Sequence, residues 1–325
     1  MTNKPHDSLF KSVFQNPENA AAELRHVLAP DHVSAIDWAT LTLEPGSYID
    51  DKLADQHSDL LFSANARTSG ERVLVYVLFE HRSSPEPRMA LRLLSYMVRI
   101  WERFADANKD APLPLILPAV LAHAPGGWRV PTRFSSLFSP SLGELATHVL
   151  PDFAYAVDDL QRTNDADLRR RTIARQARLA LWLMRDARDS ALLLRRLAFW
   201  QDELESLARM PGGRRALTPL LRYITLVAPQ LQLEQIRAIL KERAPTAESI
   251  TMTIAEQLRA EGMAKGKAEG KLEGKVESLV LVLESRGIRV EAHVRDRLSA
   301  MATHELDVLL VRAASGESLG DLLEK

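Results

Sequence analysis

Two apolar runs on either side of a turn sequence constrain this 325-residue chain more than any other feature. The first run is Leu60–Phe62 and the second is Val73–Phe79, and both are rich in aliphatic or aromatic residues. The segment 65–72 between them contains asparagine, serine and glycine, which favour a reversal of the chain. Because neither run alternates with polar residues, the pattern predicts a β-hairpin buried within an α/β sheet.

Two carboxylates flank this hairpin. A turn centred on Ser69 and Gly70 pairs residues whose numbers sum to 139, so that Asp59 lies opposite Glu80. A looser loop would shift this register by one or two residues. Arg82 shares the face of Glu80, because strand side chains alternate. Paired carboxylates beside an apolar core favour Mg²⁺ or Mn²⁺, and the alternative is a surface hairpin with an ion pair between Glu80 and Arg82.

Composition limits the possible function classes. The net charge of −1 provides no overall basic field, so a site for nucleic acid has to be a local patch. The chain contains no cysteine, which excludes disulfides and thiolate zinc sites and fits a reducing cytoplasm. The longest apolar run, residues 113–124, is too short and too interrupted by proline to span a bilayer. We therefore expect a cytoplasmic protein without a membrane partner.

The order of expected elements predicts an α/β fold with a mixed sheet flanked by helices, followed by an all-helical C-terminal region. Helices are expected at 8–14, 18–28 and 88–104, and strands at 36–43, 114–123 and 153–160. Further helices with arginine-rich polar faces are expected at 167–185, 189–209, 214–228 and 233–242, and Pro245 breaks this series. We divide the chain into a core at 1–160, a helical region at 161–245 and a C-terminal region at 246–325.

Two further groups of residues could serve a site. Asp7, in the first helix, could complete a metal site, and an N-terminal helix cap is the simpler role. The helix at 88–104 carries Arg88, Arg92, Tyr96 and Arg99 at spacings of three and four residues. Such a stripe would grip phosphates beside the carboxylates, although an arginine face in solvent has the same pattern.

The last part of the chain predicts a long helix followed by a small helical module. Glycine recurs at every fourth position from Gly262 to Gly274, and the four lysines and four glutamates between residues 261 and 277 cancel in charge. Each glycine inside a helix costs about 1 kcal/mol relative to alanine, so the repeat indicates close helix approach or deliberate flexibility. We expect a homo-oligomer formed through this C-terminal helical region.

Several motifs in a fixed order resemble one known family. They are His6–Asp7 with Phe10–Lys11, Asp59–Phe62, Phe79–Ser84, Met89–Arg92 with Tyr96, Leu121–Trp128 and the Glu-Gly-x-x-x-Gly tail. Together they resemble the YhgA-like putative transposases, also called recombination-promoting nucleases of the PD-(D/E)XK superfamily. The resemblance implies a PD-(D/E)XK-type sheet and a divalent-metal-dependent DNA endonuclease, linked to recombination and to mobile-element or phage-defence biology.

The resemblance also assigns roles to individual residues. Asp59 and Glu80 match the metal-binding acids of the family, and Asp159 matches a later acid, with Asp158 equally near. Arg82 stands where the family usually has glutamine and where the wider superfamily has lysine. Because arginine cannot lose a proton, this departure implies that Arg82 orients phosphate instead of activating water.

The missing lysine leaves Lys11 and Lys52 as replacement candidates, and it also weakens the case for activity. The first interpretation is an active Mg²⁺- or Mn²⁺-dependent nuclease that acts on DNA. The second is a catalytically weakened relative that acts in nucleic-acid binding or protein regulation. A third is a multimerisation protein built around the helical tail. No DDE triad is evident, so we expect no strand transfer.

Overall fold

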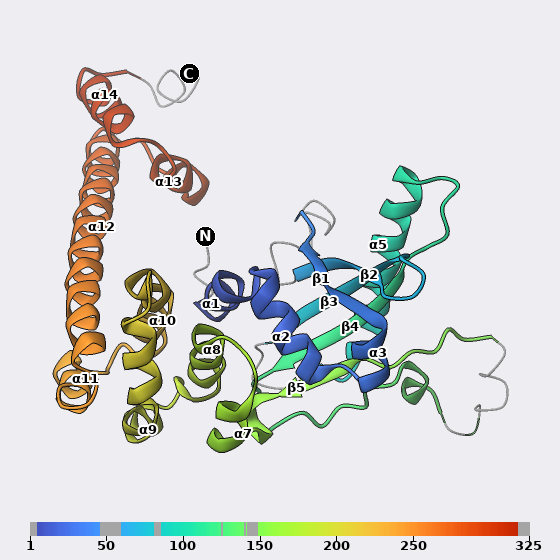
Figure 1. Cartoon of the computed structure of the whole chain (residues 1–325). Coiled ribbons are helices and arrows are strands. Elements are labelled where there is room, and N and C mark those ends of the chain that lie inside the picture. Colours follow the sequence, from blue (N-terminus) through green and yellow to red (C-terminus); the bar gives the residue numbers. More distant parts are fainter. Residues whose placement is uncertain are drawn as a thin grey trace. The chain divides into compact units, whose positions relative to one another are not determined.

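The computed structural model describes residues 5–45, 60–80, 86–124, 126–139, 141 and 149–317, with backbone alone for residues 77–80 and 265. The chain divides into two compact units, Met1–Met252 and Thr253–Lys325. The first unit contains a mixed sheet flanked by helices, and the described part of the second contains helices (Figure 1). The predicted α/β class with a helical C-terminal region is therefore confirmed.

The described sheet has five strands in the order β1-β2-β3-β4-β5. Their bounds are Ile36–Leu43 for β1, Leu60–Ala66 for β2, Arg72–Glu80 for β3, Leu115–Ala122 for β4 and Ala156–Asp159 for β5. β1, β2 and β3 pair antiparallel, whereas β4 runs parallel to β3 and β5 runs parallel to β4. The parallel pair requires a crossover, and helix α5, Met89–Ala107, lies within it.

The predicted hairpin of β2 and β3 is confirmed, but its predicted register is wrong by two residues. Observed partners sum to 137, as in Leu60 opposite Val77. The turn is centred one residue earlier than expected, because the amide of Ala66 donates a hydrogen bond to the carbonyl of Glu71. Gly70 ends the turn with a φ of 71°, a left-handed conformation that glycine adopts without strain.

Helices cover both faces of the sheet (Figure 1). The N-terminal helices are α1, Pro5–Phe14, α2, Pro17–Val27, and α3, Pro30–Ala35. Phe10 of α1 and Leu24 of α2 line a small apolar cavity with Phe62 of β2 on one face. On the other face, the apolar side of α5 packs in one cluster with Leu74 and Tyr76 of β3. The sheet is therefore the middle layer of three.

The helical region follows β5. Its elements, preceded by the short 3-10 turn η2 at Phe134–Leu137, are η4, Leu160–Arg162, α7, Asp165–Arg170, α8, Arg175–Asp186, α9, Ser190–Ala208, α10, Gly213–Val227, and α11, Leu233–Leu240. The single helix predicted at 167–185 is wrong, because the backbone turns to an extended conformation at Arg171 and separates α7 from α8. A Cβ at Gly213 would lie 2.3 Å from the carbonyl oxygen of Ala208, so α10 follows α9 closely only because this residue is glycine.

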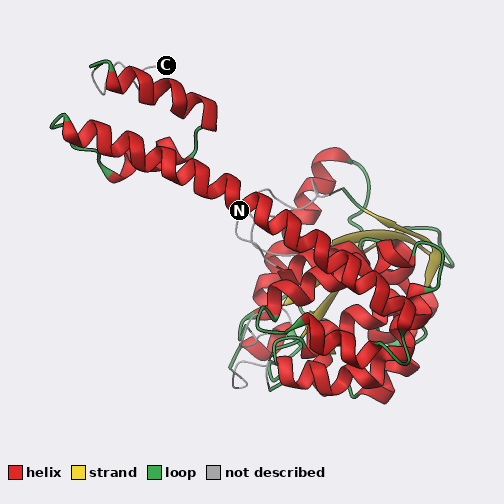
Figure 2. Ribbon diagram, turned by 90° about the vertical axis from the view of Figure 1, so that its left-hand side faces the viewer, coloured by secondary structure: helices red, strands yellow, loops and turns green. Residues whose placement is uncertain are grey.

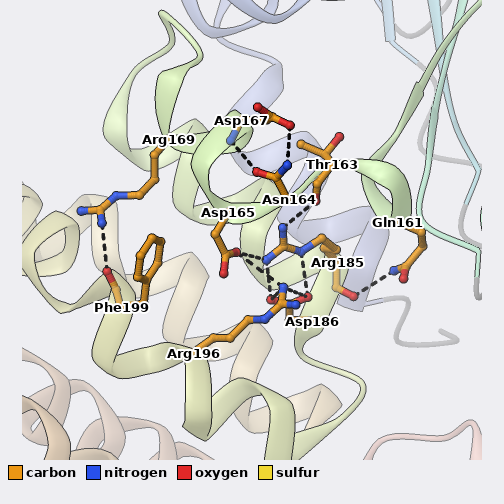
Figure 3. Close-up of polar contacts among 10 residues, drawn as sticks. All are labelled: Gln161, Thr163, Asn164, Asp165, Asp167, Arg169, Arg185, Asp186, Arg196 and Phe199. Atoms are coloured by element: carbon orange, nitrogen blue, oxygen red, sulfur yellow. Dashed lines mark hydrogen bonds and ion pairs between the residues drawn. The ribbon is translucent and has the colours of Figure 1, made fainter.

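A cluster around the buried Arg185 joins α7, α8 and α9 to one another. Arg185 of α8 pairs with Asp165 and Asp186, and its Nη1 atom donates to the carbonyl of Thr163 at 2.8 Å (Figure 3). Arg196 of α9 also pairs with Asp186, at 3.0 Å (Figure 3). Because the side chains of Arg185 and Asp186 are almost fully buried, these pairs are shielded from solvent screening.

A second buried cluster crosses from α2 to β5. Arg171 lies 2.6 Å from a carboxylate oxygen of Glu23 and pairs through two nitrogens with Asp158, at 2.7 Å each. All three side chains are less than 10% exposed. Burial, and then the negative charge of Asp158, hold the pKa of Glu23 well above its ordinary value. Arg171 therefore contacts two carboxyl groups with a single positive charge, and the raised pKa of Glu23 favours its protonated form.

The second unit has its own small core. The long helix α12, Pro245–Ser285, begins in the first unit, and α13, Ala292–Ser299, and α14, Thr303–Ala314, follow it. Pro245 starts this helix, because proline fits a first helical turn. Leu279, Leu298 and Leu306 form the centre of an apolar cluster contributed by all three helices. Among the residues described (Figure 2), no helix has the length and apolar character needed to cross a membrane.

We predict that Arg171→Ala lowers the free energy of unfolding by about 3–5 kcal/mol, because it leaves two buried carboxyl groups without a cation. Urea denaturation measures this change. The matched control is Arg170→Ala, which removes an exposed partner of Asp167 and costs less than about 1 kcal/mol. Equal losses in both variants would contradict the role given to Arg171.

We also predict that the free energy of unfolding of the wild type falls, relative to that of the Glu23→Gln variant, as pH rises from about 4.5 towards neutrality. The raised pKa makes the folded state hold a proton that the unfolded state has released, so this contribution is full below the ordinary pKa and is lost above the folded one. Urea denaturation across this pH range measures it. Glu242→Gln, at an exposed site, should follow the wild type.

Candidate functional site

The carboxyl ends of three parallel strands meet at one edge of the sheet. Glu80 ends β3 and pairs with Ala122, which ends β4, and Ala122 pairs with Asp159, which ends β5. Neighbouring strands are about 4.8 Å apart, so the three strand ends lie within about 10 Å. We call these residues, together with His123, the C-terminal edge. In α/β sheets, ligands bind outside the carboxyl ends of the strands, so this edge is the candidate site.

Of the three predicted catalytic residues, the structure locates one by its backbone. Glu80 is the last residue of β3, and its side chain is not described. Asp59 and Arg82 lie outside the described residues, as does Lys52. Direct opposition of Asp59 and Glu80 belonged to the register that sums to 139, which the observed ladder does not adopt. The roles of these residues stay predictions.

Two histidines and a tyrosine gather at the C-terminal edge. Nδ1 of His6, in α1, lies 2.7 Å from the hydroxyl oxygen of Tyr223, in α10, and the two are hydrogen-bonded. The ring of His6 is centred 4.9 Å from that of His123 and 5.3 Å from that of Tyr223. Burial raises the pKa of the Tyr223 hydroxyl, which keeps it neutral. This His6–His123–Tyr223 cluster joins the first helix, the end of β4 and a helix of the helical region.

Sequence reasoning missed this cluster. In the sequence, His6 stands out only as part of a motif with Asp7, and His123 only as the end of an expected strand. Their positions beside Asp7 and directly after an apolar strand were the available signals. Tyr223 had no such signal, because 217 residues separate it from His6 and its own helix has an ordinary amphipathic pattern.

Asp7 lies next to the cluster on α1. The helix begins at Pro5, so Asp7 is in its first turn, and the predicted N-cap role is wrong. Its side chain is 8% exposed, which is low for a carboxylate. Lys11 follows one turn later on the same helix and is half-buried. Asp7 is therefore brought towards the C-terminal edge by the contact of its neighbour His6 with His123.

Asp159 lies at the edge but holds a turn. Its Oδ2 atom accepts a hydrogen bond of 2.6 Å from the amide of Trp128, and Arg162 pairs with it at 3.2 Å. A Cβ at Gly127 would lie 2.9 Å from the same oxygen, so the turn needs glycine there. The adjacent Asp158 belongs to the buried arginine cluster described above. These contacts favour structural roles for both acids.

The basic stripe of α5 spreads along the helix. Arg88 is exposed at its start, and the Nε atom of Arg92 donates to the hydroxyl of Tyr96 at 3.3 Å. The indole of Trp101 donates to the carbonyl just before β4, so the last turns of α5 lie at the opposite edge of the sheet. Arg88 and Arg92 are therefore closer to the C-terminal edge than Arg99.

Carboxylates at strand ends are oxygen donors of the kind that bind Mg²⁺ and Mn²⁺. Within the described ranges, no group of three or more histidine, aspartate or glutamate side chains is arranged to hold a metal ion. That finding does not extend to Asp59 and Glu80, whose side chains are not described. The three predicted metal ligands, Asp59, Glu80 and Asp7, are all carboxylates, which suit a hard cation. Of the three, the structure describes the side chain of Asp7.

The chain is similar in sequence to several known proteins. The family model described as "Putative transposase, YhgA-like" matches residues 4–210. The "Recombination-promoting nuclease RpnD" of Escherichia coli O157:H7 is 29% identical over 259 residues, which cover 79% of this chain and 95% of that protein. The "Recombination-promoting nuclease RpnA" of Escherichia coli K12 is 28% identical over 261 residues, 79% of this chain and 84% of that protein.

A third relative carries a different description. The "Inactive recombination-promoting nuclease-like protein RpnE" of Escherichia coli K12 is 29% identical over 264 residues, 80% of this chain and 83% of that protein. No solved structure matches the chain significantly. The family match contains His6, Glu80 and His123 and ends before α10. Because the match covers more than half of its residues, the chain belongs to the YhgA-like putative transposase family.

Proposed function

We propose that this protein is a DNA endonuclease that hydrolyses phosphodiester bonds with a divalent metal ion and acts in recombination. The observation that carries the proposal is the position of Glu80, which ends the central strand at the level where the two parallel strands also end. This is the edge where α/β sheets bind ligands. The similarity to RpnD and RpnA, both named nucleases, supports the same activity class.

The predicted acids have a defined task in this proposal. Asp59 and Glu80, with Asp7, hold Mg²⁺ or Mn²⁺. The bound ion supplies an acidified water and stabilises negative charge on the phosphodiester. Arg82 holds a phosphate oxygen through its fixed guanidinium and does not take up a proton, because arginine stays charged.

In this proposal the arginines of α5 position the DNA, and the His6–His123–Tyr223 cluster holds the residues at the C-terminal edge in place. Arg88 and Arg92 contact phosphates close to the C-terminal edge, with Tyr96 fixing the direction of the Arg92 side chain. Arg99 contacts the backbone further away. The hydroxyl of Tyr223 fixes the ring of His6, and thereby the first turn of α1 that contains Asp7.

One alternative has its own observation. RpnE is described as inactive although it is as similar to this chain as RpnD. A protein that keeps the fold but lacks a lysine at position 82 would bind nucleic acid or regulate a partner without cutting. Metal binding distinguishes the two functions, because only the nuclease requires it.

The C-terminal helical region has a separate role in the proposal, which is self-association. Val308 and Val311 of α14 lie one turn apart and are both more than half exposed, as is Leu281 of α12. Apolar side chains in this position are available to a second copy of the same unit.

We predict that the purified protein nicks or cuts supercoiled plasmid with Mg²⁺ or Mn²⁺ and not with EDTA. Asp59→Asn and Glu80→Gln each lower the cleavage rate by at least about 100-fold, because each removes charge that the reaction needs. Gel electrophoresis measures the rate, and calorimetry with Mn²⁺ measures loss of metal binding.

The matched control is Asp31→Asn, which neutralises an exposed acid on α3 and should leave cleavage unchanged. Cleavage that persists in both Asp59→Asn and Glu80→Gln would place the activity elsewhere. Absence of cleavage with every metal ion would instead favour the non-catalytic function.

We further predict that Tyr223→Phe lowers kcat for plasmid cleavage by about tenfold and leaves KM unchanged, because His6 loses the hydrogen bond that fixes its ring. The ¹⁵N chemical shifts of the His6 imidazole report the same loss without any activity. Tyr155→Phe is the matched control, because it removes another buried hydroxyl, which donates to the carbonyl of Pro131 at 3.0 Å. Equal effects of both variants on kcat would reduce Tyr223 to a structural role.

A further inference from the structure

The net charge of the helical region differs strongly from that of the whole chain. Residues 161–245 contain 16 arginines and one lysine against nine acidic residues, a net charge of +8, whereas the whole chain carries −1. Arginine thus provides all but one of these cations, and its planar fork of donors matches phosphate oxygens better than lysine does. A local surplus of this size attracts polyanions, even on a chain of neutral overall charge.

The acids of this region divide between interior and surface. Asp186, Glu203 and Glu205 are buried, whereas Asp167, Asp189, Asp202, Glu234 and Glu242 are exposed. Asp165 and Asp186 form the network with Arg185 (Figure 3), and Glu203 lies within 3.1 Å of Arg175 and Arg178. Glu205 accepts a hydrogen bond from the backbone amide of Ala247 at 3.0 Å. Exposed arginines and lysines nevertheless outnumber exposed acids by twelve to five in this region, so the surplus positive charge is on the outer surfaces of the helices. It is most one-sided at 206–233, which contains four arginines and no acidic residue.

Helix α10 lies in this one-sided segment and has two different faces. Leu217, Leu220 and Tyr223 are buried, and Arg214 and Arg222 are exposed. The two arginines are eight residues apart, which is about 12 Å along a helix. One DNA strand carries a phosphate every 3.4 Å or so, so this distance spans about three phosphates.

The buried face of α10 connects this surface to the candidate site. Tyr223 is hydrogen-bonded to His6, whose ring lies 4.9 Å from that of His123 at the C-terminal edge. Arg222 directly precedes Tyr223 in the chain. Arg188, exposed just before α9, is close enough to Tyr223 for its positive charge to act on the hydroxyl. The basic surface therefore begins beside the edge.

We propose that Arg188, Arg214 and Arg222 form a surface that binds the phosphodiester backbone of DNA and leads it to the C-terminal edge. The inference rests on the proposed function for the identity of the nucleic acid, and it adds the surface that holds it. Because these arginines contact phosphates, the surface binds DNA without regard to sequence. It lies in α10 and in the turn before α9, so the helical region contributes directly to substrate binding.

The test measures binding without cleavage. A short fluorescein-labelled DNA duplex of arbitrary sequence is titrated in EDTA with the full-length protein, and anisotropy gives the affinity at several salt concentrations. Arg214→Gln/Arg222→Gln lowers the slope of log affinity against log salt by about two units, since each phosphate contact contributes about 0.9. Free inorganic phosphate at the same ionic strength should not displace the duplex, which separates a backbone surface from a single-phosphate pocket.

The matched control is Lys241→Gln/Arg243→Gln, which removes the same charge from exposed positions after α11 and should leave the slope within half a unit of the wild type. An unchanged slope in the α10 variant, or an equal change of slope in both variants, would contradict the proposed DNA-binding surface. A protein that cuts plasmid but shows no dependence on Arg214 and Arg222 keeps the nuclease proposal and loses this one. A protein that shows the slope change but never cuts keeps this surface and loses the nuclease.

Discussion

The central strand β3 is the constraint on which the rest of the structure depends, because its two sides pair in opposite senses. One side forms the hairpin with β2, and the other forms a parallel ladder with β4. A parallel neighbour cannot follow through a tight turn, so the chain crosses over, and α5 covers one face of the sheet on the way. β5 repeats the direction of β4. The carboxyl ends of three strands therefore meet at one edge, and Glu80 and Asp159, which are far apart in the sequence, both lie at that edge.

Buried charges hold the helical region against that sheet. Taking Arg171 and Arg185 out of water is costly, and each is compensated by acids at hydrogen-bonding distance. The acids lie on α2 and β5 for Arg171, and on α7 and the end of α8 itself for Arg185. Such pairs are specific in direction, since a misplaced helix would leave a buried charge without its partner. This specificity matters for the candidate site, because it fixes α8 and the helices packed on it, and α10 brings Tyr223 to His6. Stability and the geometry of the edge thus depend on the same contacts.

Family membership and fold do not by themselves decide activity, since RpnD and RpnE have opposite descriptions at equal similarity to this chain. Activity therefore has to be argued from particular side chains, which is why the proposals above name the residues to be tested. Overall charge was a poor guide to the proposed DNA-binding surface. The net charge of −1 correctly excluded a basic field over the whole molecule, but it concealed a surplus of +8 within 85 residues.

The sequence by itself determined the α/β class, the hairpin, the long C-terminal helix and the order of the family motifs, because apolar periodicity and turn residues act between near neighbours. Tertiary structure decided the rest. The hydrogen bonds of the turn moved the register by two residues, and the buried position of Arg171 divided one expected helix into two. Asp159 became the anchor of a turn, and Tyr223 became a partner of His6. Apart from the turn, whose hydrogen bond joins Ala66 and Glu71, these outcomes come from contacts between residues far apart in the chain, which no local pattern encodes.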